Sequence, residues 1–156
     1  MPFPLPETFF TNTLNMRFSA KIQRTIHAPV SKVWAALTQP ELVKQYFWGT
    51  RLVTSWQPGT PIAFEGEWEG KPYRDKGAVL VFEPEKMLRY DYHSSWSDLE
   101  DRPENYQVIT YRVKPKGSST LLTVTQHNID TLEKKIHSAQ NWAALLTALK
   151  RLAEKS

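Results

Sequence analysis

A chain of 156 residues, 40% of them hydrophobic and 23% charged, has the size and composition of one globular domain and excludes a disordered protein. The absence of cysteine excludes disulfide bonds, thiolate metal sites and a cysteine nucleophile. The formal net charge is +4, and most of the 20 basic residues are spread along the chain rather than gathered in a stripe, which argues against a nucleic-acid partner.

The first 16 residues, MPFPLPETFFTNTLNM, contain three prolines and no basic residue. They lack the basic start of a signal peptide, and no apolar run of the chain approaches the ~20 residues that cross a membrane. We therefore predict an irregular N-terminal arm over residues 1–16, a single domain over residues 17–156, no membrane partner and a cytoplasmic location.

The first part of the domain combines one strand with two short helices. Apolar and polar side chains alternate over residues 17–28, which is typical of a half-buried strand, and Pro29 ends it. Apolar residues then recur at helical spacing over 29–38 and 40–48. Pro40 separates the two helices, because the residue before a proline avoids the helical conformation.

About six closely spaced strands are expected over residues 50–129, joined by turns without intervening helices, which indicates an antiparallel meander. Alternation places Ile62, Phe64 and Trp68 on one inward face, and Leu88, Tyr90 and Tyr92 on another. The chain ends in a long amphipathic helix. Its apolar stripe comprises Trp142, Leu145, Leu146, Leu149 and Leu152.

The predicted fold class is therefore α+β: a curved antiparallel sheet of about seven strands wrapped on a long C-terminal helix. The two short helices follow the first strand and close one end. Bulky side chains that hold a curved sheet away from its covering helix tend to leave a cavity, and the aromatic residues from Trp34 to Trp48 are expected near that junction.

The segment IHAPVSKVWAALTQPELVKQYF, residues 26–47, resembles the signature of the Activator of heat-shock-protein-90 ATPase homologue family, within the START-like or SRPBCC superfamily. The matching pattern is Ala28-Pro29, Val33-Trp34, Ala36-Leu37-Thr38 and Pro40-Glu41. Weaker matches follow in the same order, in WQPGTPIAFEG, GAVLVFEPEKMLRYDY and NWAALLTALKRLAE. The resemblance covers residues 17–154 and implies a helix-grip fold with a deep cavity between sheet and long helix.

Several polar side chains share a predicted strand face with apolar ones. Arg24 is in register with Ile22 and Ile26, and Gln126 with Leu122 and Val124. Burying such a group costs free energy unless it is hydrogen-bonded, so Arg24 must reach an acid, extend to the rim or face a wet cavity. The predicted ligand-binding set is Arg24, Trp48, Phe64, Trp68, Tyr90, Tyr92, Gln126, Trp142 and Leu146. Plain core packing is the alternative for its apolar members.

Groups suited to catalysis are scarce in the sequence. His27 and His93 fall out of register with the apolar strand faces, and both are expected in solvent. No pair of histidines has metal-ligand spacing, so neither a metal site nor a cofactor is expected. Asp98, Glu100 and Asp101, in the polar segment 95–105, are expected in a solvated loop. No Asp or Glu is clearly in an inward register, which argues against an acid–base enzyme, and an inward Asp91 or His93 would reverse that argument.

Three functions follow from the residues and the resemblance. The preferred one is non-catalytic binding of a hydrophobic or aromatic small molecule between sheet and C-terminal helix. The first alternative is a chaperone-associated regulator of a stress response that acts through its outer surface. The second is a cyclase or hydrolase of the SRPBCC superfamily. The protein is expected to be a monomer or a homodimer.

Overall fold

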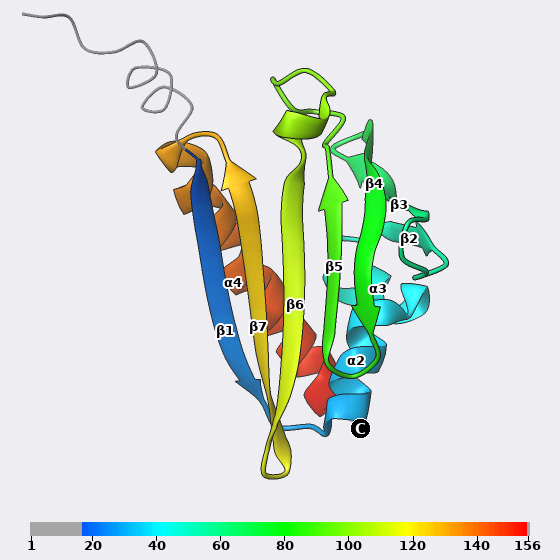
Figure 1. Cartoon of the computed structure of the whole chain (residues 1–156). Coiled ribbons are helices and arrows are strands. Elements are labelled where there is room, and N and C mark those ends of the chain that lie inside the picture. The colour runs from blue at the N-terminus through cyan, green and yellow to red at the C-terminus, as the bar shows by residue number, and fades with distance from the viewer. Residues whose placement is uncertain (1–16, 156) are drawn as a thin grey trace, which may run out of the picture.

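The computed structural model describes residues 17–155, and the predicted N-terminal arm lies outside them. The described residues form one curved sheet with helices on its concave side (Figure 1). The elements in chain order are β1 (Phe18–Ile26), α2 (Val30–Thr38), α3 (Pro40–Tyr46), β2 (Arg51–Thr54), β3 (Pro61–Trp68), β4 (Lys71–Glu83), β5 (Met87–Tyr92), the 3-10 turn η1 (Pro103–Asn105), β6 (Gln107–Lys116), β7 (Ser119–Ile129) and α4 (Leu132–Glu154).

The sheet has seven strands in the order β1-β7-β6-β5-β4-β3-β2. Every neighbouring pair is antiparallel. From β2 to β7 the chain is a meander, and β1 joins it beside β7, so that the first and last strands of the domain are neighbours. The predicted α+β helix-grip architecture is confirmed.

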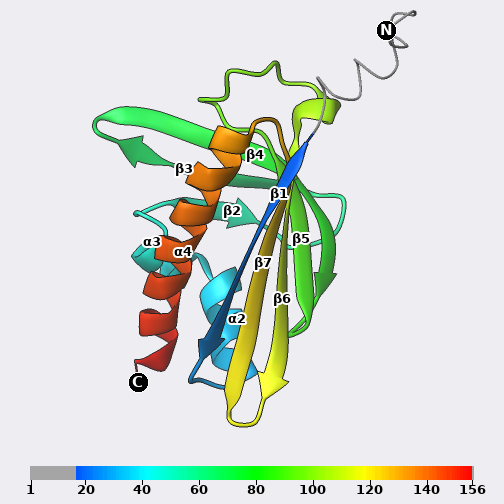
Figure 2. The same cartoon turned by 90° about the vertical axis from the view of Figure 1, so that its left-hand side faces the viewer.

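Helix α4 covers the concave face of the sheet (Figure 2). It packs chiefly on β1 and also reaches β7, α2 and α3. Its buried side chains follow the predicted stripe, and the Oγ1 atom of Thr131 caps its start by accepting from the backbone N–H of Lys134. Among residues 17–155, no helix is long and apolar enough to span a bilayer.

The last turns of α4 are tied to the free edge of β1. The Lys150 Nζ atom donates to the backbone carbonyl of Thr25 at 2.8 Å, and the Glu154 carboxylate accepts from the backbone N–H of His27 at 2.7 Å. Lys150 and Glu154 also pair with each other at 2.7 Å. Lys150 and Glu154 therefore each bond to the backbone at the end of β1 and also to each other within α4.

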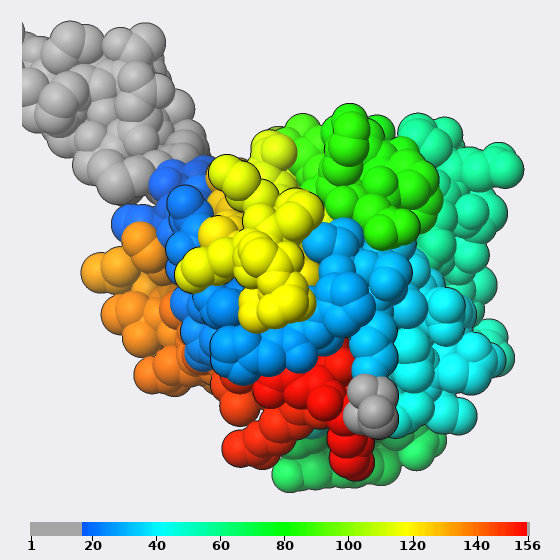
Figure 3. Space-filling view, turned by 90° about the horizontal axis from the view of Figure 1, so that it is seen from below, coloured from blue at the N-terminus to red at the C-terminus, as the bar shows by residue number. Residues whose placement is uncertain are grey.

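The helical pair α2–α3 closes one end of the grip. The hydroxyl of Tyr46 in α3 donates to the carbonyl of Ala36 in α2 at 2.7 Å, in a buried contact that fixes the two helices together. Seen from below, the short helices, the last turns of α4 and the β6–β7 turn meet at this end of the molecule (Figure 3). The opposite end is formed by the β3–β4 hairpin and by the segment between β5 and β6 (Figure 1).

An irregularity in β4 sets which of its side chains face α4. The register with β5 shifts between Val79 and Val81, so the alternation of faces changes phase there. At Gly77 the two backbones approach so closely that an added Cβ would lie 1.8 Å from the carbonyl oxygen of Asp91. The Asp91 carboxylate accepts from the backbone N–H of Ala78 at 2.8 Å and fixes this geometry.

Removing buried volume from α4 is predicted to destabilise the protein strongly. Leu146 is fully buried. Leu146→Ala is expected to lower the free energy of unfolding by about 2–5 kcal/mol, measured by chemical denaturation, because it deletes apolar contacts and leaves a cavity. Leu132→Ala in the same helix is the matched control. Leu132 is 55% exposed, and its replacement is expected to change the free energy of unfolding by less than about 0.5 kcal/mol. Equal losses in the two variants would contradict the packing described here.

Candidate functional site

A row of polar side chains crosses the concave face beneath α4, and we call it the polar row. It consists of Gln126 in β7, Gln107 in β6, Tyr92 in β5 and Asp75 in β4, with Trp142 of α4 above it. Tyr92 and Gln107 are direct cross-strand partners, and Gln126 lies opposite Ile109, the next inward position on β6. Three strands thus place amide and phenol groups side by side within the core.

Hydrogen bonds join most of the polar row. The Trp142 indole donates to the Gln126 Oε1 atom at 2.6 Å. The Gln126 Nε2 atom donates to the Gln107 Oε1 atom and, at 3.2 Å, to the Tyr92 hydroxyl, which itself donates to Gln107 at 2.8 Å. Gln126 is only 4% exposed, so these bonds offset the cost of burying its amide.

Aromatic rings form the wall beside the polar row. The Phe64 ring stacks on Phe47 at a centroid distance of 5.7 Å and tilts against Tyr90 at 5.2 Å. The Tyr90 ring also tilts against the Tyr92 ring, at a centroid distance of 6.4 Å. Burial raises the pKa of Tyr90 and Tyr92, and Tyr111 nearby raises the pKa of Tyr90 further. These phenols are therefore neutral at physiological pH and can donate or accept hydrogen bonds.

Asp75 is the inward acid that the sequence analysis did not find. It pairs with the core residue Phe64 across β3 and β4, and its Oδ1 atom is buried without a hydrogen-bond partner. Burial raises the pKa of Asp75, while the Ser94 hydroxyl and the Ser95 backbone N–H, which face the carboxyl group, lower it in part. Its carboxylate in turn adds to the raised pKa of Tyr92.

The expectation that no acid faces inward was wrong because of the irregularity in β4. Counted back from Phe82, which pairs with the core residue Leu88, strict alternation would turn Asp75 outward. The shift between Val79 and Val81 reverses the phase, so that Asp75 and Gly77 lie on the same face as Val79. Gly77, two positions after Asp75 in a predicted strand, was the available signal, since an isolated glycine in a strand often marks a bulge or a close approach.

The structure brings some of the predicted ligand-binding residues together and leaves others apart. Phe64, Tyr90, Tyr92, Gln126 and Trp142 belong to the aromatic wall or the polar row. Leu146 of α4, one helical turn after Trp142, is fully buried. These side chains fill the space between sheet and helix with contacts to one another.

Arg24, Trp48 and Trp68 lie at the periphery. The Arg24 guanidinium donates to the carbonyl oxygens of Gln23 at 2.8 Å and Ala143 at 3.3 Å, which is the rim position given above as one alternative. Trp48 is 51% and Trp68 52% exposed. The regular β3–β4 register keeps Trp68 on the face of Phe64, but this end of the hairpin extends past α4 (Figure 2), so the helix does not bury this residue.

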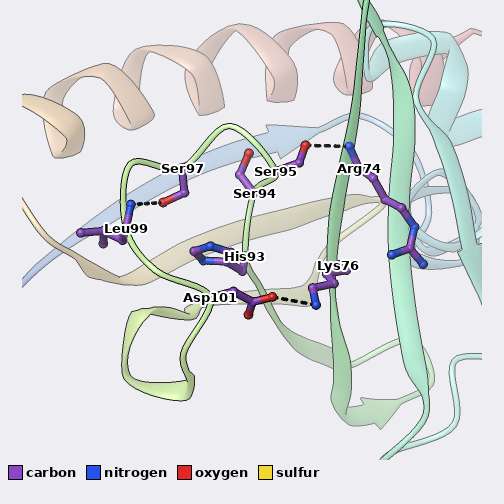
Figure 4. Close-up of a pocket in the computed structure, with 8 residues that line it drawn as sticks. All are labelled: Arg74, Lys76, His93, Ser94, Ser95, Ser97, Leu99 and Asp101. Carbon is purple, nitrogen blue, oxygen red and sulfur yellow. Dashed lines mark hydrogen bonds and ion pairs between the residues drawn. The ribbon is translucent and has the colours of Figure 1, made fainter.

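The hollows in the surface lie away from the contact between sheet and α4. One, of about 420 Å³, is lined by Trp68, Glu69, Lys71 and Trp96. Another, of about 500 Å³, lies between β4 and the segment that follows β5 (Figure 4). Neither coincides with the cavity that the family resemblance implies.

The prediction that His93 is solvated was wrong. Its side chain is 8% exposed because the segment after β5 folds back and stacks the Tyr106 ring on the imidazole at 5.4 Å. His93 pairs with Lys76 on the outer face of the sheet, and Asp91, two positions earlier in β5, shares that face. Neither group points inward, whereas Asp75 does. His27 is exposed, as expected.

Comparisons with known proteins agree with this architecture. The model of the family described as Activator of Hsp90 ATPase homolog 1-like protein matches residues 27–154. A solved protein of Cytophaga hutchinsonii is 38% identical over 88% of this chain and 94% of its own, with a TM-score of 0.77. A protein of Mesorhizobium loti is 22% identical over 89% of this chain and 98% of its own, with a TM-score of 0.75.

A third similar structure is DynU16, from the dynemicin biosynthetic locus. It is 20% identical over 88% of this chain and 47% of its own, with a TM-score of 0.73. The Mesorhizobium loti protein and DynU16 are similar in fold alone. No match was found among curated proteins. The family resemblance inferred from residues 26–47 is confirmed.

The raised pKa of Asp75 predicts a specific dependence of stability on pH. The folded protein keeps this proton over a range in which the unfolded chain, with a pKa of about 3.9, has lost it. The stability contributed by the neutral carboxyl group is therefore complete below about pH 4 and is lost as pH rises through the raised pKa. The free energy of unfolding of the wild type, minus that of Asp75→Asn, is expected to fall as pH rises above about 4.

Glu65→Gln supplies a control of opposite sign. A hydrogen bond from Arg74 holds the pKa of Glu65 below its usual range, with burial opposing it and Arg51 assisting. The stability that Glu65 contributes is therefore present above about pH 4.3 and is lost as pH falls. A flat difference curve for Asp75→Asn would show that its carboxyl group is not buried as described.

Proposed function

The chain belongs to the Activator of Hsp90 ATPase homolog 1-like family, and from its concave face we propose that it binds a hydrophobic or aromatic small molecule between sheet and α4. The ligand carries a hydrogen-bond donor, such as a hydroxyl or an amine, that reaches Asp75. Its apolar part lies against the aromatic wall formed by Phe64, Tyr90 and Tyr92.

The observation that carries this proposal is the unpartnered Oδ1 atom of Asp75. A buried acceptor without a partner costs about 1–3 kcal/mol, and native proteins rarely leave one without a reason. The Ser94 hydroxyl and the Ser95 backbone N–H face the carboxyl group but form no hydrogen bond with Oδ1, and the other members of the polar row satisfy each other. A donor on a bound ligand would complete this atom. A few convergent polar groups among aromatic side chains are typical of small-molecule sites.

The proposed ligand enters the space beside the aromatic wall past the end of α3. Phe47, directly after this helix, stacks on Phe64 and is only partly buried. The half-exposed Trp48 ring packs edge-on against Phe47 at 5.7 Å. Displacing Phe47 opens the wall toward Phe64, and Trp48 serves as a fluorescent reporter of that step. The place of DynU16, a protein of similar fold, in a biosynthetic locus supports a small-molecule role.

Replacing Gln126 is predicted to weaken binding. A panel of aromatic and lipid-like molecules with hydroxyl or amino groups is screened by tryptophan fluorescence and thermal melting. For each molecule that binds, Gln126→Met is expected to lower the affinity about tenfold, because methionine cannot bond to Tyr92, Gln107 and Trp142. Gln23→Met, an exposed glutamine on β1, is the matched control and should leave affinity unchanged.

Two outcomes of this experiment contradict the proposal. One is a panel in which no molecule shifts the fluorescence or the melting temperature. The other is binding that responds equally to Gln126→Met and Gln23→Met, which would place the ligand elsewhere. Chemical conversion of a bound molecule that Asp75→Asn abolishes would instead support the cyclase or hydrolase alternative, for which Asp75 supplies the inward acid.

Regulation of a chaperone through the outer surface is a second candidate. It is favoured by the family's description and by the exposed aromatic rings of Trp68 and Trp96, which line one hollow together. Large exposed aromatic side chains are enriched at protein interfaces. Trp68→Ser combined with Trp96→Ser would then abolish capture of the cognate heat-shock protein, while Gln126→Met would leave it intact. The reverse pattern would reject this candidate.

A further inference from the structure

The sheet has two edge strands, and β1 is the longer of them. β1 has nine residues and pairs only with β7, whereas β2 at the opposite edge has four. In an antiparallel pair, alternate residues direct both of their backbone groups to the same side of the strand. The Thr25 carbonyl, which Lys150 reaches from α4, shows that the odd-numbered residues of β1 face the free side. The edge groups therefore belong to Ser19, Lys21, Gln23 and Thr25.

Only the first half of this edge is open. Arg24 occupies the Gln23 carbonyl and Lys150 occupies that of Thr25, each at 2.8 Å. Within residues 17–155, no side chain bonds to the backbone N–H or C=O group of Ser19 or Lys21, and no second strand lies along this side of β1 (Figure 2). Such an open edge is a template for another strand.

Two exposed apolar side chains of α4 flank the open half of the edge. Leu132 and Ile136 are each more than half exposed. Leu132 precedes Lys150 by about five helical turns, and Ile136 precedes Glu154 by the same distance, so each pair projects from the same side of α4. Since Lys150 and Glu154 bond to the end of β1, Leu132 and Ile136 face the same edge nearer its start.

The apolar pair lies level with the open backbone groups. α4 and β1 begin at the same end of the molecule (Figure 1), and Arg24 donates to the Ala143 carbonyl at 3.3 Å. A helix rises about 1.5 Å and a strand about 3.4 Å per residue, so Ile136 and Leu132 lie about three and about five residues before Arg24 along β1. They therefore flank residues 19–21.

We propose that two copies of this chain associate through the open half of β1, antiparallel about a two-fold axis at Ala20. In this register Ser19 of each copy lies opposite Lys21 of the other, and their edge groups exchange hydrogen bonds. On the concave face, Phe18 lies opposite Ile22 of the other copy, which pairs two apolar side chains. No like charges lie directly opposite each other.

The same axis brings the two α4 helices together. Both lie on the concave side of the joined sheet, and the axis at Ala20 is level with the middle of the apolar pair, so Leu132 of one copy faces Ile136 of the other. One rotation thus pairs the open backbone groups and also covers the exposed apolar side chains, whereas an unrelated strand would satisfy the backbone alone. This interface uses no residue of the polar row and goes beyond the proposed small-molecule site.

Sedimentation velocity over a series of protein concentrations tests the proposal, together with amide hydrogen exchange. The wild type is expected to pass from monomer to dimer with a micromolar dissociation constant, and the amides of Ser19 and Lys21 should exchange more slowly in the dimer. Ile136→Lys should raise the dissociation constant at least tenfold, because it places an ammonium group against Leu132. Lys21→Pro should abolish the dimer, since proline lacks only the N–H on the free side and leaves the β1–β7 pairing intact.

Val53→Lys is the matched control, because Val53 is an exposed apolar residue of β2 at the opposite edge of the sheet. It should change the dissociation constant less than twofold, and well-dispersed NMR spectra establish that each variant is folded. The proposal is overturned if the wild type stays monomeric, if Val53→Lys and Ile136→Lys have equal effects, or if the dimer survives both Ile136→Lys and Lys21→Pro.

Slow exchange of the Ser19 and Lys21 amides in a monomer would mean that residues 1–16 pair with this edge, and it would overturn the proposal as well. Gln126→Met should leave the dimer unchanged, so failure here does not bear on the small-molecule site.

Discussion

The contact between α4 and the concave face of the sheet is the constraint on which the other features of this protein depend. The apolar stripe of the helix buries Leu145, Leu146 and Leu149 against strands that are far apart in the chain. Within this contact, the hydrogen bond from Trp142 to Gln126 fixes one position of the helix along the sheet. Apolar packing is tolerant of small shifts, whereas a buried indole-to-amide bond is not.

The polar row takes its shape from that fixed position. Gln126 is oriented by Trp142, and it then holds Gln107 and Tyr92 in one hydrogen-bonded set. Asp75 lies at the end of the row on β4, away from the chief contact of α4 with β1, and its Oδ1 atom remains without a partner. The result is a rigid network next to one unsatisfied acid. Such an arrangement favours recognition of a donor at one defined point over general affinity for apolar molecules.

The sequence predicts the architecture well, because periodicity reports which face of an element is buried. The strand at residues 17–28, the helical pair around Pro40 and the stripe from Trp142 to Leu152 were all recognised from spacing alone. The prediction was less successful where a residue's environment depends on a distant segment. His93 is covered by Tyr106, and Trp68 is exposed because its hairpin outruns α4. Neither fact has a local signature.

The candidate sites show the same difference between features that a local sequence pattern predicts and features that it does not. The inward placement of Tyr90, Tyr92 and Gln126 was predicted because they alternate regularly with apolar neighbours. Asp75 was missed because one phase shift in β4 reverses the face of every residue before it. The hollow between β4 and the segment after β5 was missed because it depends on the pairing of Lys76 in β4 with Asp101, which lies in a loop that looks solvated by composition.

The hydrogen bonds from Lys150 and Glu154 to the edge of β1 affect how two copies of this protein can associate. The edge strand of an open sheet has unpaired backbone N–H and C=O groups, which can pair with a strand of another molecule and so promote aggregation. Here charged side chains of α4 already occupy the Thr25 carbonyl and the His27 amide, while Arg24 occupies the Gln23 carbonyl. These contacts occupy backbone groups at the last residues of β1 and just after it, so this part of the edge disfavours pairing with a strand of another molecule.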